Sequence, residues 1–224
     1  MSDDCLPVTV IVPALNAARM LAATVESVGN VTAVIVVDGG SRDGTESVAS
    51  SLEARVVTAP KGRGTQIAAG VAAADAGWLL ILHADTVLDP AWRRAARDHM
   101  AGGPGKAGYF TFRLTSHDPR ARRLERLVAL RCRWFGLPYG DQGLLIHSDL
   151  LAAVGGVQPL PLMEDVDLIR RLGRRRIALL DANATTSAEK WERDGWLRRS
   201  ARNLFCLTLW LVGIPPKLIA RIYG

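Results

Sequence analysis

Short apolar runs alternate with helix-like stretches through the first hundred residues of the chain. The apolar runs, rich in Val, Ile and Leu, lie at residues 8–12, 33–37, 54–57 and 78–82. Stretches with helical periodicity separate them at about residues 17–28, 43–52 and 64–75. This alternation predicts an α/β fold in which helices cover both faces of a mostly parallel central sheet. Ligands of such folds bind at the carboxyl ends of the strands.

The pattern changes after residue 100. The side chains of residues 109–114 alternate in polarity, as in a strand with one solvent-exposed face. A basic amphipathic helix follows them. "GLLIH" (143–147) predicts a further strand, and "MEDVDLIRRL" (163–172) predicts the start of a helix. Residues 185–224 are predicted to form a C-terminal helical appendage with a break at its two adjacent prolines. We therefore expect one α/β domain over residues 1–184, followed by this appendage.

Composition and charge narrow the classes of function. The chain has 224 residues, of which 49% are hydrophobic, as in a globular protein with a sizeable core. Its net charge of +6 suits polyanionic partners such as nucleotide phosphates, nucleic acid or an anionic membrane surface. Cys5, Cys132 and Cys206 have neither zinc nor disulfide spacing. The sequence opens without a secretory signal, and its longest apolar run, residues 204–214, would form a helix of only about 17 Å. These features predict a cytoplasmic protein.

Polar segments follow three of the predicted strands. They are "PALN" (13–16), "DGGSRDGT" (38–45) and "HADT" (83–86). In the third segment, His83 and Asp85 are two residues apart on extended chain, so both side chains can face one ligand. A carboxylate beside an imidazole suits Mn²⁺ or Mg²⁺. Alternatively, Asp85 only closes a turn or caps the helix that follows.

Two glycine-containing segments suggest nucleotide binding, one at residues 38–45 and one at residues 59–70. Asp38 follows the second strand without a capping role, since Asp43 can cap the next helix, and its carboxylate can accept hydrogen bonds from a base. The glycines after it match neither GxGxxG nor a P-loop, which excludes both. Lys61 and Arg63 stand among glycines just before a helix and suit a diphosphate. The alternative is an ordinary glycine turn with solvated charges.

Carboxylates recur in the second half of the chain. Glu164, Asp165 and Asp167 begin a predicted helix, where they either complement its dipole or provide a general base. Asp141 and Gln142 lie between a proline-glycine turn and a strand. They can bond to sugar or acceptor hydroxyl groups, or only shape the turn.

Tryptophan and arginine are mixed in the last forty residues. Trp191, Trp196 and Trp210 lie among many cations. Such a segment is typical of an interfacial helix on anionic lipid. The alternative, which the segment favours slightly, is a helical hairpin that packs its apolar face on the core.

Taken together and in this order, the segments resemble a family 2, GT-A-fold glycosyltransferase. "VTVIVPALNAARMLAATVESV", "VIVVDGGSRDGT", "ILHADT" and "VGGVQPLPLMEDVDLIRRL" are similar to four motifs of that family, in a resemblance that covers residues 7–175. "HAD", "YGDQGLLI" and "SAEKW" are most similar to a small bacterial subgroup labelled as arsenosugar-type glycosyltransferases. The resemblance implies a GT-A three-layer sandwich, with a nucleotide-binding half at about residues 1–100 and an acceptor-binding half at about residues 101–184.

The resemblance also implies a role for each matching residue. It implies that the nucleotide-sugar donor contacts Pro13, Ala14, Leu15, Asn16, Asp38, Arg63, Gly64, His83, Ala84 and Asp85. It implies a divalent ion, Mn²⁺ or Mg²⁺, on Asp85 with His83. It further implies a general base at Asp165 with Glu164 beside it. Asp141, Gln142 and Trp191 are the candidate acceptor contacts.

Some positions depart from the family pattern. Gly39 stands where the family has a second Asp, and His83 replaces the first Asp of DxD. Lys190 and Ser187 replace Arg and Gln of the QxxRW motif found in processive members, so polymer synthesis is not expected.

The expected reaction is an inverting, hexosyltransferase-type transfer from a nucleoside diphosphate sugar to a hydroxyl group of a small molecule or lipid. No nucleic acid partner is expected, whereas the C-terminal helices are expected to contact the inner face of the membrane. A nucleotidyltransferase of related fold is one alternative, although the chain lacks a "GGxGTRL"-like loop after the first strand. The other alternative is a non-catalytic module that binds a membrane surface or nucleic acid.

Overall fold

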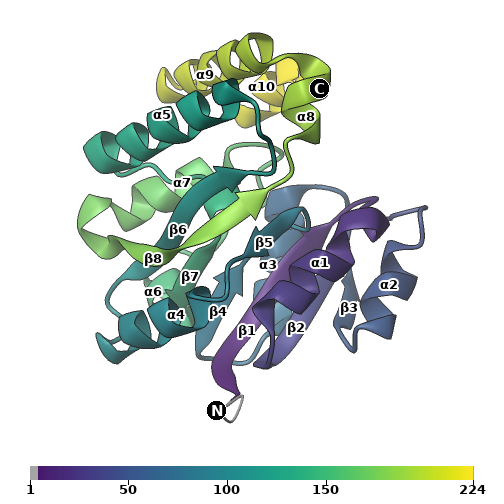
Figure 1. The fold of residues 1–224 in the computed structure, drawn as a ribbon. Helices are drawn as coiled ribbons and strands as arrows, with labels where there is room; N and C mark the ends of the chain where they lie inside the picture. Colours follow the sequence, from purple (N-terminus) through teal and green to yellow (C-terminus); the bar gives the residue numbers. More distant parts are fainter. Residues whose placement is uncertain (1–4, 224) are drawn as a thin grey trace.

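The computed structural model describes residues 5–223, which fold around one eight-stranded sheet (Figure 1). The strands lie side by side in the order β3-β2-β1-β4-β7-β6-β8-β5. Their bounds are β1 Leu6–Ala14, β2 Val31–Asp38, β3 Arg55–Thr58, β4 Trp78–Ile81, β5 Thr86–Leu88, β6 Ala107–Leu114, β7 Leu144–His147 and β8 Ile177–Thr186. The helices are α1 Ala18–Val28, α2 Thr45–Ser51, α3 Arg63–Ala73, α4 Trp92–Ala101, α5 Pro119–Phe135, α6 Ser148–Ala153, α7 Glu164–Leu172, α8 Glu189–Asp194, α9 Trp196–Leu211 and α10 Pro216–Tyr223. Two 3₁₀ turns, η1 Gly140–Gln142 and η2 Arg174–Arg176, complete the chain.

The strand–helix alternation predicted for the first half is confirmed. β3, β2, β1 and β4 pair in parallel, and helices cover both faces of this part of the sheet. Side chains of β1 alternate between the faces, so that Val10 joins the apolar cluster with Leu21 of α1, whereas Ile11 joins the cluster with Ile67 of α3. Gly70 lets α3 lie close on the sheet, because a Cβ there would come within 2.9 Å of the Val37 side chain.

The expectation of a mostly parallel sheet is wrong, because the sheet is mixed. β7 is antiparallel to both β4 and β6, and β5 is antiparallel to β8. Apolar runs predict that strands exist, but the direction of pairing depends on the connections between them. A parallel neighbour needs a crossover of a dozen or more residues. β5 follows β4 after only residues 82–85, and it leaves the parallel part to pair with β8 at the far edge.

Helices form over most of the predicted C-terminal segment within the described part of the chain, although residues 185–186 still belong to β8 and the first helix begins at Glu189. α9 ends at Leu211 and α10 begins at Pro216, as the paired prolines predict. The first of these helices pack on the α/β body, since Trp196 is buried in one cluster with Tyr109 and Val128. Within residues 5–223 no helix combines the length and the apolar content that crossing a bilayer requires.

Candidate active site

A polar cavity of about 160 Å³ brings together residues from six separate segments. It lies beyond the carboxyl end of β4, between the start of α7 and the C-terminal helices. Its lining includes Arg63, His83, Asp85, Tyr139, Asp141, Met163, Asp165, Thr186, Ser187, Lys190, Trp191, Arg199 and Asn203. Three of the predicted acids, Asp85, Asp141 and Asp165, therefore share one space although they are far apart in sequence.

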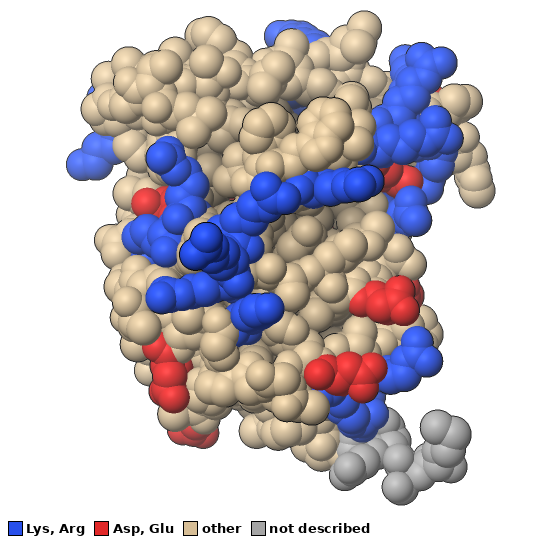
Figure 2. All heavy atoms as spheres, turned by 90° about the vertical axis from the view of Figure 1, so that its left-hand side faces the viewer, with Lys and Arg blue, Asp and Glu red and all other residues tan. Residues whose placement is uncertain are grey.

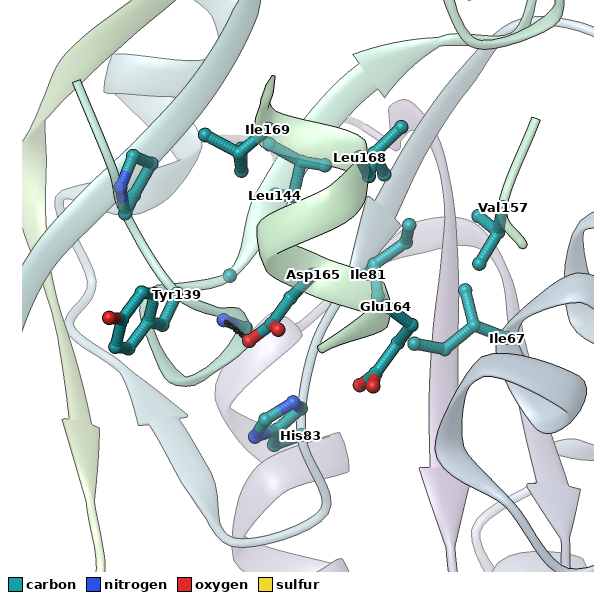
Figure 3. A pocket seen from close by; sticks show the side chains of 13 residues that line it. Ile67, Ile81, His83, Tyr139, Leu144, Val157, Glu164, Asp165, Leu168 and Ile169 are labelled. Carbon is teal, nitrogen blue, oxygen red and sulfur yellow. Dashed lines mark hydrogen bonds between the residues drawn. The ribbon is translucent and has the colours of Figure 1, made fainter. Parts of the chain in front are cut away.

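His83 and Asp165 approach each other at Gly140. The backbone N–H of Gly140 donates to Oδ2 of Asp165 at 2.8 Å, and a Cβ on Gly140 would lie only 2.6 Å from Nε2 of His83. Figure 3 shows Asp165 and Glu164 at the start of α7, above His83, with apolar side chains such as Ile81 behind them. Burial, helped by the charge of Arg63, lowers the pKa of His83 to about 4. The imidazole is therefore neutral at pH 7 and keeps a lone pair free for a cation.

Asp85 is held by the C-terminal part of the chain. Nζ of Lys190 lies 3.0 Å from its Oδ2, and the N–H of Ser187 donates to its carbonyl oxygen at 3.2 Å. Burial alone would raise the pKa of Asp85, but the charge and hydrogen bond of Lys190, together with His83 and a backbone hydrogen bond, outweigh it and lower that pKa. Asp85 is thus an ionised carboxylate that accepts a cation within the cavity.

Arg63 joins the start of α3 to the start of α7. Its Nε donates to Oε1 of Glu164, and its Nη2 lies 3.9 Å from Oδ2 of Asp165. Glu164 is 1% exposed, and this burial raises its pKa in spite of the guanidinium. Glu164 faces the neighbouring apolar pocket and not the polar cavity.

The pKa of Asp165 is shifted in the opposite direction to that of Glu164. Burial opposes its charge, but Arg63 and the N–H groups of Gly140 and Val166 favour it more strongly, so that the pKa of Asp165 is lowered. Asp165 is therefore the more acidic carboxylate of this pair, and it is the one that lines the cavity.

The two predicted acceptor residues of η1 have different surroundings. Oδ1 of Asp141 is buried and has no hydrogen-bond partner among the described residues, and burial raises the pKa of Asp141 to about 6. Gln142 is 2% exposed and its amide is fully engaged, since it donates to the carbonyl of Phe110 and accepts from the N–H of Tyr139 and from Arg131. Asp141 is thus available to a ligand, whereas Gln142 holds the turn.

Asp38 lies at the carboxyl end of β2 and does not line the cavity. Its Oδ2 accepts the N–H groups of Gly40 and Ser41 at 2.7 and 2.8 Å, while its buried Oδ1 has no partner in residues 5–223. Asn16 supports the same edge, because its Oδ1 accepts from the N–H of Arg42 and its own N–H donates to Ser41. The predicted contact of Asp38 with a base stays a prediction.

The other predicted donor residues lie in the framework around this edge. Pro13 and Ala14 end β1 and are buried, and Leu15 beside them is 36% exposed. Gly64 packs on a loop, since a Cβ there would lie 2.6 Å from the carbonyl oxygen of Gln158. The carbonyl of Ala84 accepts a hydrogen bond from the Thr24 hydroxyl at 2.9 Å. Their contacts with a donor also stay predictions.

Gln66 is a structural residue that the sequence analysis missed. It is 4% exposed, and its Nε2 donates to the carbonyl oxygens of Ala14 and Val37 at 2.7 and 2.8 Å. It thereby joins the ends of β1 and β2. Nothing in its local sequence distinguishes it from a solvent-facing glutamine.

The contribution of α9 to the cavity was also missed. Arg199 and Asn203 line it together with Leu207, at i, i+4 and i+8 positions that share one helix face. That spacing in the sequence could have indicated that these three side chains face the same way. Trp191, a predicted acceptor contact, lines the same side, where it stacks on Trp196 at 6.0 Å and lies under Arg199 at 5.3 Å.

An α/β sheet with charged groups gathered beyond its strand ends is the architecture of an enzyme that binds nucleotides and their phosphates. The family model described as "Glycosyl transferase family 2" matches residues 9–148, which is more than half of the chain. The protein therefore belongs to glycosyl transferase family 2. Among curated protein sequences, none matches the chain.

Solved structures share the fold at low sequence identity. The chain is similar to glucosyl-3-phosphoglycerate synthase from Mycobacterium tuberculosis, solved with Mn²⁺, UDP and glucosyl-3-phosphoglycerate, with a TM-score of 0.64 at 21% identity over 93% of this chain and 81% of that chain. It is similar to S. aureus TarS 1-349, with a TM-score of 0.64 at 14% identity over 81% of this chain and 60% of that chain. A further structure of TarS contains UDP-GlcNAc and gives a TM-score of 0.61 at 14% identity over 80% of this chain and 58% of that chain.

Proposed function

We propose that the protein is an inverting hexosyltransferase that moves a sugar from a nucleoside diphosphate sugar to an acceptor hydroxyl group. The observation that carries this proposal is the convergence of Asp85 and Asp165 on one polar cavity that also contains Lys190 and Arg63. Such a transfer needs positive charge at the leaving diphosphate and one base at the incoming hydroxyl. Family membership and the UDP in similar structures support this donor class. The "HAD" and "YGDQGLLI" motifs support membership of the arsenosugar-type subgroup.

We propose Asp85 and His83 as the residues that hold Mn²⁺ or Mg²⁺. Asp85 already accepts one cation, the ammonium of Lys190, and the neutral His83 lines the same cavity. Within residues 5–223, no group of three His, Cys, Asp or Glu side chains could hold a metal ion. The remaining ligands would be diphosphate oxygens and water, as is usual for Mg²⁺. A bound divalent ion supplies a Lewis acid that neutralises charge on the leaving diphosphate.

Asp165 accepts the proton of the acceptor hydroxyl in this proposal. The hydroxyl oxygen attacks the anomeric carbon on the side opposite the diphosphate, and the configuration inverts. The N–H groups of Gly140 and Val166 fix the plane of the carboxylate and leave further lone pairs free for the proton. Glu164 acts indirectly, because it holds the guanidinium of Arg63 near Asp165.

The acceptor is proposed to be a small molecule or lipid with a free hydroxyl group. The unpartnered oxygen of Asp141 and the ring of Trp191 line the cavity on the side of η1 and α8, where they would contact it. We further propose that the enzyme works in the cytoplasm, with peripheral contact between its C-terminal helices and the inner face of the membrane.

Replacement of Asp85 tests the donor and metal proposals together. The wild-type protein should show a rise in Tm with one class among UDP-, GDP- and dTDP-sugars, and most of that rise should require Mn²⁺. Asp85→Ala should weaken Mn²⁺-dependent donor binding by about tenfold or more, because its carboxylate is the only acidic ligand proposed. The exposed Asp75 offers the matched control, since Asp75→Ala should bind donor normally. Undiminished metal dependence in Asp85→Ala would place the ion elsewhere.

The raised pKa of Asp141 predicts an acid limb in the pH profile. An ionised carboxylate accepts a stronger hydrogen bond from the acceptor than a neutral carboxyl group does, and Asp141 takes up a proton as the pH falls through about 6. We expect kcat/KM to fall as the pH drops below that value. Asp165, whose pKa is lowered, does not titrate there.

Asp141→Asn should be slow at all pH values and should lack this limb. Asp149→Asn, at a side chain that is 80% exposed, should keep the wild-type profile. An unchanged limb in Asp141→Asn would assign it to another group.

A further inference from the structure

Three helices at one end of the molecule, α5, α9 and α10, carry most of its exposed large apolar side chains. We refer to residues 119–135 and 196–223 as the helical end, which lies at the top of Figure 1. Of the 14 large hydrophobic residues that are exposed within residues 5–223, 11 belong to the helical end. Single exposed apolar residues are normal, but a concentration of this kind marks an interaction surface.

These side chains form outward-facing stripes at helical spacing. On α9, Leu197, Leu204 and Leu211 recur every seven residues and are 86%, 64% and 50% exposed. On α5, Leu127 and Trp134 have the same spacing and are 63% and 61% exposed. Each helix buries its opposite side, so the stripes are not needed for packing on the body.

The charges of the helical end are almost all positive. α5 contains six arginines, α9 three, and α10 adds Lys217 and Arg221. Glu125 is the one acid within the three helices, and it is buried against Arg113 and Arg122. Figure 2 shows Lys and Arg side chains below, beside and at the top edge of a mainly uncharged area at the upper end, whereas most visible Asp and Glu side chains lie in the lower half.

We propose that the helical end docks on the surface of an anionic lipid bilayer. A bilayer accommodates both features, because apolar side chains enter the acyl boundary while arginines meet lipid phosphates. A second copy of the chain would bring two arginine-rich surfaces against each other. Nucleic acid would satisfy the arginines and leave the leucine stripes in water. The proposal does not depend on the reaction proposed above.

The docking surface and the cavity share helix α9. Its outer side carries Leu204, and its inner side places Arg199 and Asn203 in the cavity wall. A docked molecule would therefore hold the acceptor side of the cavity within one helix diameter, about 10 Å, of the lipid surface. This geometry favours an acceptor that resides in the membrane or is released there.

Vesicle sedimentation with the full chain tests the proposal. We expect binding to vesicles made of equal parts of phosphatidylcholine and phosphatidylglycerol to be at least about tenfold tighter than to pure phosphatidylcholine, and to weaken with added salt. Leu204→Glu should weaken binding to the anionic vesicles by about tenfold or more, because it puts a charge at the acyl boundary. Leu179→Glu is the matched control, since Leu179 is 59% exposed on β8, and it should bind normally.

Several results would overturn the proposal. Equal binding to the two kinds of vesicle would remove the role of the arginines, and equal behaviour of Leu204→Glu and Leu179→Glu would remove the apolar stripe. A lipid-free dimer that Leu204→Glu dissociates would make the surface a contact between copies. Tight binding to duplex DNA without vesicle binding would make it a nucleic acid site. Asp165→Asn should bind vesicles like the wild type. A wild-type protein that binds anionic vesicles but transfers no sugar would contradict only the proposed reaction.

Discussion

Asp165→Asn should lower kcat for sugar transfer by about 10²- to 10⁴-fold while leaving the Kd of the donor diphosphate almost unchanged. The amide has the shape of the carboxylate and can still accept one of the two backbone N–H groups that Asp165 binds, so the start of α7 should stay close to its position. It cannot accept the proton of the attacking hydroxyl group. Single-turnover transfer and isothermal titration with the nucleoside diphosphate would measure the two quantities separately.

The matched control for this variant lies two residues further along the same helix. Asp167 pairs with Arg171 at 2.7 Å and does not line the cavity, so Asp167→Asn should transfer sugar at a near wild-type rate. Full activity of Asp165→Asn would remove Asp165 from the role of base. Asp141, which lines the same cavity and whose buried Oδ1 has no partner among the described residues, would then be the next candidate.

Arg63→Met should lower the free energy of unfolding by about 3 kcal/mol near neutral pH, because it leaves the carboxylate of Glu164 buried without its ion-pair partner. A charged group that loses its only counterion in the interior retains the cost of desolvation. Denaturant unfolding would measure the loss. The double variant Arg63→Met with Glu164→Gln should recover part of it, since Asp165, another charged partner of Arg63 in this cluster, then remains.

The loss in free energy of unfolding caused by Arg63→Met should depend on pH in a direction that can be derived. Burial raises the pKa of Glu164 in the folded state above its ordinary value, and removal of Arg63 raises it further. Glu164 is neutral in both states at low pH, and its ionisation penalises the folded state as the pH rises. The deficit of Arg63→Met should therefore shrink on acidification. Arg19→Met supplies the control, because that exposed pair with Glu189 should cost less than about 1 kcal/mol at any pH. A deficit as small as that of Arg19→Met would show that Glu164 does not need its partner.

The local elements of the fold could be predicted from the sequence because their signals are local. The Val- and Ile-rich runs of β1 and β2 alternate between two apolar clusters, and each run is short enough to be a strand. The pairing of β5 with β8 could not be predicted in this way. It joins Thr86 to Thr186, and no periodicity within either strand specifies a partner at that separation.

In the candidate site, too, the features with local sequence signals could be predicted and those that depend on distant partners could not. The HADT segment and the start of α7 could be found because carboxylates stand at element ends, where ligands bind. The diphosphate contact of Arg63 stays a prediction, but the contact of its guanidinium with Glu164, about a hundred residues away, could not be predicted. For Gln142 the sequence leaves a ligand contact and a role in the turn both open, and its partners Phe110 and Arg131 come from two other elements. Long-range partners of this kind decide whether a polar side chain is free, and a single sequence does not reveal them.

The pairing of β5 with β8 also limits how the protein can be divided. The match to the family ends at residue 148, yet the turn that bears Asp85 leads straight into β5, whose only neighbour in the sheet is β8. Ser187 and Lys190, which follow β8, then hold Asp85 itself. A fragment truncated near residue 148 would retain every N-terminal motif and still lack the strand that anchors its central aspartate. Such a truncation should fail to bind nucleotide sugar, because nothing would hold β5 and Asp85 in position.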